Sequence, residues 1–521
     1  MSLAAGLLLV VAAGAASLRW LRVAQREHYL AGSVTRFEGR WLVARPVNLA
    51  LGLVTAALVV AGGIVPVLWL PAAVGLVAWP IGLSLRGRTS RLAWTRRLRT
   101  LAAVTAVVAL AVVALAAALG AWPVGVVVVG LVGPQLVDLS AWVLAPVERR
   151  LLQPFVTRAQ ARLAQVSPDV VAITGSYGKT TTKGYLKALL AQQFEVCASP
   201  ASYNNTAGLA RTINEHLHPG AEILVAEMGM YDVGEIAAMC AWIRPRVGVI
   251  TAIGPVHLER VGTIERVVQA KREILDTAEV AVLNVDDPRL AALADEVATT
   301  RKVVRCGSAT PDLDVAVRPS GAGSTDPDAD PTGPETAPTR VVVEAAGQRL
   351  EVDVAEGTHL TNLACAVGAA LAMGFRLEGL AAGVASIEPP AHRGTVEVNA
   401  AGISVIDDTF NANPLGAQHG LDALAGLAVT GRRVVVTPGM VELGPRQDPE
   451  NEAFARAAAQ AADTLIVVKR TNRRALVRGA SGGSAQVLTV DDRDQAVAWV
   501  RDQLSPGDAV LYENDLPDHF V

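Results

Sequence analysis

The chain has 521 residues, which is too long for one ordinary hydrophobic core and predicts two or three domains. Hydrophobic residues make up 51% of the chain and charged residues 18%, and the apolar excess lies almost entirely before residue 147. The net charge of −3 argues against a nucleic-acid-binding protein. The four cysteines lie far apart without a CxxC spacing, so the sequence favours neither a zinc site nor a disulfide framework.

Apolar segments dominate residues 1–150 and predict a membrane region of about five transmembrane helices. A span needs about 20 residues, and four of the five segments reach that length. The first segment is shorter, and we interpret it as a retained anchor because no basic residue precedes its apolar core and no convincing cleavage site follows. The five segments are Leu3–Leu18, Val47–Val65, Pro66–Leu85, Leu101–Trp122 and Pro123–Val147.

Arginine placement predicts the orientation of these spans. Six arginines lie between the first and second segments and six between the third and fourth, whereas the two opposite connections carry no charge. Because positively charged loops stay in the cytoplasm, we expect a multi-pass protein of the inner or plasma membrane, in contact with lipid, with residues after 150 in the cytoplasm. Asp138 lies near the end of the fifth segment, and such sparse intramembrane charge favours an anchor over an ion pathway.

A glycine-rich loop follows the membrane region. The apolar run Val170–Thr174 leads into two glycines and then into Lys179 and Thr180, which open a helical stretch. Backbone amides of such a loop surround a polyphosphate, while the lysine neutralises phosphate charge and the threonine hydroxyl coordinates Mg²⁺. Ile173 stands where the longer phosphate-loop pattern has a glycine, so the loop is the compact T-G-x-x-G-K-T type. The loop predicts that the protein uses ATP and Mg²⁺.

After residue 150, strand-like apolar runs alternate with helical stretches, which is typical of a mostly parallel sheet with helices on both faces. Residues 319–339 are rich in Pro, Gly, Ser, Thr and Asp and predict a flexible surface insertion. A second α/β pattern begins near Thr395, so we expect a central domain over 151–394 and a C-terminal domain over 395–521. The predicted strands are Val170–Thr174, Ile223–Glu227, Val247–Ile253, Ala281–Asn284, Ile403–Ile406, Val434–Val436, Leu465–Val468 and Ala509–Tyr512.

Three polar residues of the central domain are candidates for chemistry. Glu227 closes a predicted strand, His257 follows another, and Lys271 begins or lies within a helix. Open α/β sheets bind ligands at the carboxyl ends of their strands, so these positions suit a metal or phosphate site. Each residue also has an ordinary explanation, as a solvated carboxylate, a loop histidine or a surface lysine.

The order of these motifs resembles the Mur ligase family. The phosphate loop is followed by Asn204-Asn205, Glu227-x-Gly229, Gly254-x-x-His257 and Ala270-Lys271-x-Glu273, as in the central domain of that family. Further motifs resemble the family branch that adds D-alanyl-D-alanine to a muramoyl peptide: His359-x-x-Asn362, Arg393, Asp407–Pro414 and Gly439–Gly444. The resemblance covers residues 165 to about 515. After the α-helical transmembrane region that hydropathy predicts, the resemblance implies an α/β fold, namely a P-loop ATPase domain and a Rossmann-like C-terminal ligase domain.

The resemblance implies an ATP-dependent carboxylate–amine ligase acting on a cell-envelope peptide. The carboxylate attacks the γ-phosphate of ATP, an acyl phosphate forms, and an amine such as an amino acid or dipeptide displaces phosphate. Cationic groups must hold the mutually repelling carboxylate and polyphosphate, which agrees with the residue types.

Residue roles follow from the same resemblance. Lys179, Lys271, His257 and Arg393 would be catalytic. Thr180, Glu227, His257 and a carbamylated Lys271 would hold Mg²⁺, and the sequence leaves the carbamylation open. The ATP contacts would be Gly175, Ser176, Tyr177, Gly178, Lys179, Thr180, Thr181, Asn362, Arg393 and Asp408. The substrate contacts would be Asn204, Asn205, Asn411 and Asn413, although Asn411 and Asn413 could equally be turn residues.

Two features depart from the family. Membrane segments occupy the place of the N-terminal domain that holds the UDP-sugar, which leaves open whether the acceptor is UDP-linked or lipid-linked. The acidic ending Tyr512–His519 also differs from the lysine- and glycine-rich ending of the D-alanyl-D-alanine-adding branch. This acidity is equally consistent with a cationic or amine substrate and with a cap on a sheet edge.

Two other functions remain as alternatives. A poly-γ-glutamate synthetase-like ligase also combines membrane attachment with this ATPase core, but the motifs at 407–414 and 439–444 look more like the muropeptide branch. A transporter or membrane scaffold with a vestigial ligase core is disfavoured by the intact candidate residues and by the sparse intramembrane charge.

Overall fold

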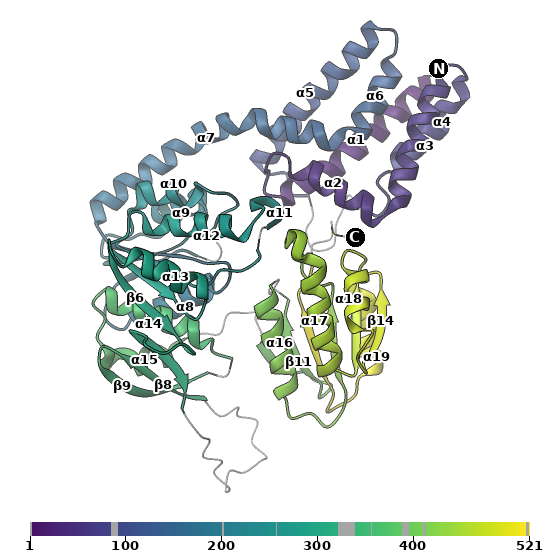
Figure 1. The fold of residues 1–521 in the computed structure, drawn as a ribbon. Helices are drawn as coiled ribbons and strands as arrows, with labels where there is room; N and C mark the ends of the chain where they lie inside the picture. Colours follow the sequence, from purple (N-terminus) through teal and green to yellow (C-terminus); the bar gives the residue numbers. More distant parts are fainter. Residues whose placement is uncertain are drawn as a thin grey trace. The chain divides into compact units, whose positions relative to one another are not determined.

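The computed structural model describes residues 3–84, 92–200, 203–256, 258–320, 339–355, 357–387, 395–409, 413–516 and 520. The chain divides into two compact units. One comprises Met1–Leu151, Lys469–Arg473 and Asp515–Val521, and the other comprises Leu152–Val468 and Arg474–Asn514. Figure 1 shows the helices of the first unit in purple and blue and two separate sheets of the second unit in teal to yellow.

Helices are the regular secondary structure of the N-terminal region where it is described. Two of its helices are long and apolar enough to cross a membrane, and up to four spans result if each of two bent helix pairs counts as one. The five-span arrangement and its orientation stay predictions. The helices are α1 (Leu3–Arg26), α2 (Ser33–Ala44), α3 (Pro46–Gly62), the 3-10 turn η1 (Pro66–Leu68), α4 (Trp69–Ala78), α5 (Arg96–Ala118), α6 (Trp122–Leu131) and α7 (Gly133–Val166).

Helix lengths differ from the predicted segments. The first helix, α1, has 24 residues and is not short. The segment predicted over Pro66–Leu85 is helical only as far as Ala78, and the segment over Pro123–Val147 is divided by a bend of 77° between α6 and α7. A proline follows both breaks, at Pro80 and Pro134, and proline disfavours a helical residue before it and removes a backbone donor. Neither apolar segment is therefore one straight helix, and the prediction of about five transmembrane helices stays a prediction.

Asp138 has a structural partner in the first unit. Its Oδ2 accepts a hydrogen bond from the backbone N of Thr35 at 2.8 Å, and its Oδ1 accepts one from Val34 at 3.2 Å. These residues open helix α2, whose own N-cap, Gly32, offers no side chain. The carboxylate of Asp138 thus satisfies the N-terminus of a neighbouring helix, where a negative charge is favoured.

The first sheet has the order β2-β3-β1-β4-β5-β6-β7-β8-β9, parallel from β2 to β7 and antiparallel beyond. The four strands predicted before residue 300 are confirmed as β1, β3, β4 and β5, although β4 ends at Ile250 rather than Ile253. Most of the predicted insertion, residues 321–338, lies outside the described residues. The strands are β1 (Asp169–Thr174), β2 (Val196–Ala198), β3 (Ile223–Glu227), β4 (Val247–Ile250), β5 (Val280–Asn284), β6 (Lys302–Gly307), β7 (Val315–Pro319), β8 (Thr339–Ala345) and β9 (Gln348–Val354).

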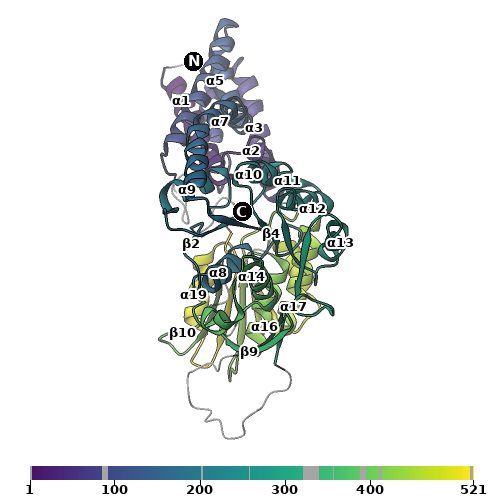
Figure 2. The same cartoon turned by 90° about the vertical axis from the view of Figure 1, so that its left-hand side faces the viewer.

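Helices cover both faces of this sheet, as Figures 1 and 2 show. One core contains side chains of α8 (Lys179–Leu190), α14 (Leu360–Ala372) and α15 (Leu380–Ala385). The opposite core includes α9 (Thr206–His216), α10 (Glu235–Ile243), α12 (Ile264–Arg272) and α13 (Pro288–Val297). The short elements are α11 (Leu258–Val261), η2 (Glu273–Leu275) and η3 (Leu377–Gly379).

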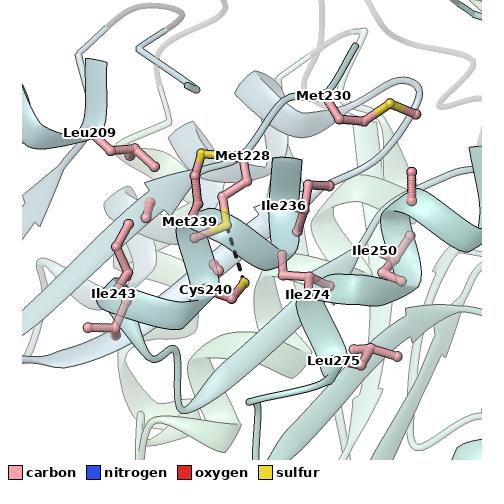
Figure 3. Packing of buried hydrophobic residues seen from close by; sticks show 14 of the residues in the cluster. Leu209, Met228, Met230, Ile236, Met239, Cys240, Ile243, Ile250, Ile274 and Leu275 are labelled. Atoms are coloured by element: carbon pink, nitrogen blue, oxygen red, sulfur yellow. Dashed lines mark hydrogen bonds between the residues drawn. The ribbon is translucent and has the colours of Figure 1, made fainter. Parts of the chain in front are cut away.

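The core that includes α9, α10, α12 and α13 also contains the residue that directly follows β3. Met228 directly follows that strand, and Cys240 Sγ lies 3.7 Å from its Sδ within a cluster that also contains Met239 (Figure 3). Val156 and Ala159 of α7 belong to the same core. The domain boundary predicted at residue 150 therefore falls inside one continuous helix.

The second sheet has the order β10-β11-β15-β12-β13-β14 and is parallel except for β10. All four strands predicted for this part are confirmed, and the two remaining strands, β10 and β14, were not predicted. Helices α16 (Pro414–Gly426), α17 (Gln447–Ala461) and α18 (Arg473–Ala480) pack on one face and α19 (Arg493–Gln503) on the other. The strands are β10 (Thr395–Val398), β11 (Ser404–Asp408), β12 (Arg433–Thr437), β13 (Thr464–Val468), β14 (Gln486–Val490) and β15 (Ala509–Glu513), and η4 (Gly444–Arg446) precedes α17.

Candidate active site

Three neighbouring strand ends form the candidate site of the first sheet. Strand β1 leads into the phosphate loop and lies between β3, which ends at Glu227, and β4, which is followed by Thr251. The register pairs Ile173 with Glu227 and Thr174 with Ile250. From β1 the chain runs to β2 and β3 on one side of β1 and then crosses to β4 on the other side. Open α/β sheets bind ligands where the strand order reverses in this way.

The phosphate loop has the conformation that its glycines permit. Gly178 has φ of 77° and directly precedes α8, which begins at Lys179. Residues other than glycine avoid this region because of their Cβ atom. A Cβ on Gly178 would also collide with the side chain of Asn362, from the first turn of α14. The structure thus brings Asn362 to the loop, next to the start of the helix that would hold phosphate.

Hydrogen bonds brace the loop against the residues that follow β4. Ser176 Oγ accepts from Gly254 N at 2.8 Å and lies 3.1 Å from Gly254 O, to which it can donate. Thr251 Oγ1 donates to the carbonyl of Tyr177. The Tyr177 ring occupies the space that a side chain on Gly254 would need, and burial raises the pKa of its hydroxyl. Ser176 and Tyr177 therefore shape the loop through their side chains.

Glu227 is the centre of a buried polar cluster. Its side chain is 1% exposed, and its Oε2 accepts from Thr180 Oγ1 at 3.0 Å and lies 2.9 Å from Lys183 Nζ. Asn204 Nδ2 donates to Oε1 at 3.2 Å. The structure brings together Thr180, Glu227 and Asn204, which the sequence singled out. Sequence reasoning missed Lys183, although its position one helical turn after Lys179 places both on neighbouring parts of one helix face.

Two lysines lie near each other at this site. Lys179 Nζ donates to Gly175 O at 2.7 Å. Lys271, near the end of α12, is 2% exposed, and burial together with the charge of Lys179 holds its pKa well below its usual range. Both effects favour the neutral amine of Lys271, which is the nucleophilic form that carbamylation requires.

Several predicted site residues have local structural partners. Asn205 Oδ1 accepts from Gly208 N at 2.9 Å and caps α9, while Asn413 Oδ1 accepts from Gly416 N at 2.9 Å and caps α16. Asp408 ends β11 in the second sheet and is 2% exposed. Asn205 and Asn413 are therefore helix N-caps, which is a common role of asparagine. His257, Arg393 and Asn411 lie outside the described residues.

Two of the sequence motifs meet in the second unit. Arg260 Nη2, from the helix that follows the 254–257 motif, lies 3.3 Å from Glu442 Oε1 in the 439–444 motif. The Arg260 side chain is 9% exposed and also lies over the Tyr231 ring, 4.9 Å from its centroid. These two motifs are therefore joined by a largely buried ion pair.

The cluster around Glu227 fits a divalent cation in part. A carboxylate and a hydroxyl oxygen 3.0 Å apart are the hard oxygen ligands that Mg²⁺ prefers. The described residues contain no group of three or more His, Cys, Asp or Glu side chains placed to hold a metal ion. A second metal position would thus require His257 and a modified Lys271.

Known proteins share this arrangement. The Mur ligase middle domain matches residues 173–327, and the Mur ligase glutamate ligase domain matches residues 392–512. A UDP-N-acetylmuramoyl-tripeptide–D-alanyl-D-alanine ligase of Mycobacterium tuberculosis is 33% identical over 387 residues, covering 69% of this chain and 73% of the relative. The chain belongs to the Mur ligase family. Its predicted enzyme class, an ATP-dependent ligase, and its α/β ligase fold are confirmed.

Solved structures agree with this Mur ligase assignment. A MurF ligase from Thermotoga maritima in complex with ADP has 27% identity and a TM-score of 0.58, covering 70% of this Mur ligase and 80% of that chain. MurF from Acinetobacter baumannii has 23% identity and a TM-score of 0.59, covering 70% and 77%, and supports the fold. The family domains match from residue 173 onward, so the apolar N-terminal helices lie outside them.

Proposed function

We propose that this Mur ligase joins the carboxylate of a muramoyl peptide of the cell envelope to D-alanyl-D-alanine, using ATP and an acyl-phosphate intermediate. The observation that carries the proposal is the shared edge of β1 and β3, where Lys179 and Thr180 open a helix beside buried Glu227. The M. tuberculosis relative bears the name of this activity. The second unit contains both matched ligase domains.

The chain's own groups suit the first step of this reaction. When the carboxylate attacks the γ-phosphate, negative charge spreads over the phosphoryl oxygens. Lys179 and the N-terminus of α8 place positive charge at the loop, where it stabilises that charge. Lys179 Nζ now donates to the loop carbonyl of Gly175, so it exchanges this partner for phosphate oxygens.

A divalent ion has residues to hold it. Thr180 and Glu227 would bind Mg²⁺, and His257 with carbamylated Lys271 would bind a second ion. The metal supplies additional positive charge to the polyphosphate. Carbamylation turns Lys271 from a basic group into an anionic oxygen ligand, which is the change that a cation site needs.

The apolar N-terminal helices anchor the enzyme in the inner or plasma membrane in this proposal. Large apolar side chains of α5 remain exposed, with Val107 and Leu110 at 66% and Leu115 at 68%. Exposed apolar patches of this kind mark membrane or protein interaction surfaces. The arginine-rich connections favour a cytoplasmic ligase, where ATP is present.

The test uses the full chain purified in detergent with ATP, Mg²⁺ and D-alanyl-D-alanine. Three acceptors are supplied in parallel: the UDP-linked muramoyl tripeptide, the same peptide without UDP, and its lipid-linked form. We expect amine-dependent ADP release together with a product heavier by the mass of the dipeptide less water. ADP release that ignores the amine would contradict the ligase function, and the preferred acceptor identifies the carrier.

Lys179→Ala supplies the matched loss-of-function variant. We expect it to lower ligase turnover by about 100-fold or more while the thermal unfolding transition is retained, because it removes charge from the phosphate site. Lys187→Ala, an exposed lysine of the same helix, is the control and should retain activity. Full activity of Lys179→Ala would show that the phosphate loop is misassigned.

A further inference from the structure

Three polar side chains end adjacent strands of the second sheet. Asp408 ends β11, Glu513 ends β15 and Thr437 ends β12, and these strands are neighbours in the order β11-β15-β12. The register pairs Asp408 with Glu513. It also pairs Val436 with Tyr512, and these two residues directly precede Thr437 and Glu513. All three side chains are at most 2% exposed. They lie at the carboxyl edge of parallel strands, where α/β folds bind ligands.

The carboxyl group of Glu513 is only half satisfied. Its Oε2 accepts a hydrogen bond from Thr437 Oγ1 at 2.6 Å. Its Oε1 is buried and has no hydrogen-bond partner among the residues that the structure describes. A buried acceptor without a partner loses its hydrogen bonds to water and gains none in return, so native proteins rarely keep one without a functional reason.

The charge around Glu513 selects the kind of ligand that could satisfy it. Burial, with a smaller contribution from the nearby Asp408 carboxylate, raises the pKa of Glu513 to about 8, because both disfavour the negative charge of Glu513. An anionic ligand would disfavour that charge further, and an apolar ligand would leave Oε1 without a donor. A cation that carries N–H donors offsets the repulsion and supplies the missing hydrogen bond.

The surroundings of Glu513 are held in place. Thr437 Oγ1, which donates to Glu513, also accepts from Gly439 N at 2.9 Å. Asn514 Nδ2 donates to Gly439 O at 2.7 Å, and the backbone N of Asn514 donates to Asp408 O at 3.2 Å. These bonds tie together the loops after all three strands, so the unpaired oxygen is presented by a preorganised frame.

We propose that Glu513, supported by Thr437 and Asp408, binds the ammonium group of the amine substrate. The inference rests on the proposed function, because it assigns the amine side of the amide-forming reaction to the edge of the second sheet. Glu513 is then a specificity-determining residue, and the substrate class is a primary amine that arrives protonated. In this proposal, the acidic ending contributes a residue that binds the substrate, in addition to its position at the edge of the sheet.

Equilibrium binding tests this proposal without turnover. Isothermal titration of the full chain in detergent compares D-alanyl-D-alanine with N-acetyl-D-alanyl-D-alanine, which lacks the ammonium charge. We expect the wild type to bind the charged dipeptide about tenfold more tightly or better, as one charge-assisted hydrogen bond provides. Glu513→Gln should remove most of this preference, whereas Glu397→Gln, an exposed glutamate of β10 in the same domain, should keep it.

A second pair of variants, at Thr437, tests the proposal even if Glu513→Gln fails to fold. Thr437→Ser keeps the hydroxyl that orients Glu513 and should keep the preference, and Thr437→Val should weaken it. The proposal is overturned if the wild type does not prefer the charged dipeptide, or if Glu513→Gln weakens both dipeptides equally. It is also overturned if only ATP affinity falls, because the cluster would then belong to the nucleotide site. Failure of amine-dependent ADP release would instead contradict the ligase function, since binding requires no reaction.

Discussion

Lys271 shows how burial prepares a side chain for chemistry. It is 2% exposed and lies near the charge of Lys179, and both effects favour the neutral amine. A neutral amine can take up CO₂, whereas an arginine at the same position stays charged. The position of Lys271 thus supports the modification that the sequence left open.

Removal of CO₂ should inactivate the enzyme reversibly. In a CO₂-depleted buffer we expect ligase turnover to fall by about 10-fold or more, because a metal ligand is lost, and bicarbonate should restore it. Lys271→Arg should be inactive in both buffers, and Lys187→Arg should behave like the wild type. If bicarbonate has no effect on the wild type while Lys271→Arg is inactive, Lys271 acts unmodified.

Glu513 predicts a pH dependence of stability. Its pKa rises from 4.5 to about 8 on folding, so the folded state holds a proton that the unfolded state releases. The folded state is therefore favoured fully below pH 4.5 and loses that advantage as the pH rises toward 8, by a few kcal/mol at about 1.4 kcal/mol per pKa unit.

Thermal unfolding across pH 5 to pH 8 measures this effect. Relative to the wild type, Glu513→Gln should gain stability as the pH rises, because the amide does not ionise. Glu397→Gln should run parallel to the wild type throughout. A constant difference between wild type and Glu513→Gln at every pH would contradict the raised pKa.

Some site residues could be predicted from the sequence and others could not. Thr180 and Glu227 lie in motifs, and the parallel register of β1 and β3 brings them within 3.0 Å. Lys183 belongs to no motif used for the prediction, and the sequence pointed to Glu513 only as part of the acidic ending Tyr512–His519. The significance of both residues depends on burial and on which strand ends are neighbours. Strand order in a parallel sheet is a long-range property, which local patterns do not specify.

At the scale of elements, the residue that precedes α8 has a left-handed backbone conformation and also lies in close contact with a neighbouring side chain. Gly178 has a positive φ and packs directly against Asn362. Gly184, in the same helix, is exposed and has open space around its Cα. The two glycines therefore provide a matched pair in one helix.

Alanine at these two positions should have opposite effects. Gly178→Ala should lower ATP affinity and cost about 1–2 kcal/mol of stability, because a side chain at positive φ is strained and displaces Asn362. Gly184→Ala should add about 0.5–1 kcal/mol by favouring the helix. Thermal unfolding with and without ATP measures both effects. Equal stabilisation of the two variants would contradict the loop conformation.

Element prediction succeeded where periodicity was local and unbroken. Strands such as β12 and β13 are short apolar runs buried on both faces, and the sequence located both. The apolar N-terminal segments were harder, because hydropathy does not report a helix end such as that at Ala78 or the bend after Leu131. Strand β14 was missed, and none of its five residues is fully buried, which is consistent with its position at the edge of the sheet.

At the scale of the whole molecule, the first unit contains both ends of the chain. It includes the N-terminal helices together with Lys469–Arg473 and Asp515–Val521. Phe520 is 9% exposed, its ring lies 6.2 Å from that of Phe37 in α2, and the Arg40 guanidinium lies 5.6 Å from its centroid. Lys469 Nζ donates to the carbonyls of Leu516 and Phe520, each at 3.2 Å.

Removing the Phe520 ring should loosen helix α2. Phe520→Ala deletes the aromatic and cation–π contacts, each of which contributes about 0.5–1 kcal/mol or more. Hydrogen–deuterium exchange over Ser33–Ala44 should become faster. Phe155→Ala, at a residue that is 62% exposed, serves as the control and should leave this exchange unchanged. Unchanged exchange in Phe520→Ala would show that the tail does not support α2.

The pairing of Phe37 with Phe520 also fixes the order of events during synthesis. These residues are far apart in sequence, so helix α2 cannot acquire this neighbour until Phe520 has been synthesised. While the chain is still shorter than that, the Phe37 ring and the Arg40 guanidinium lack the aromatic partner that they have in the folded protein. Packing of α2 in its final environment is therefore a late event of folding.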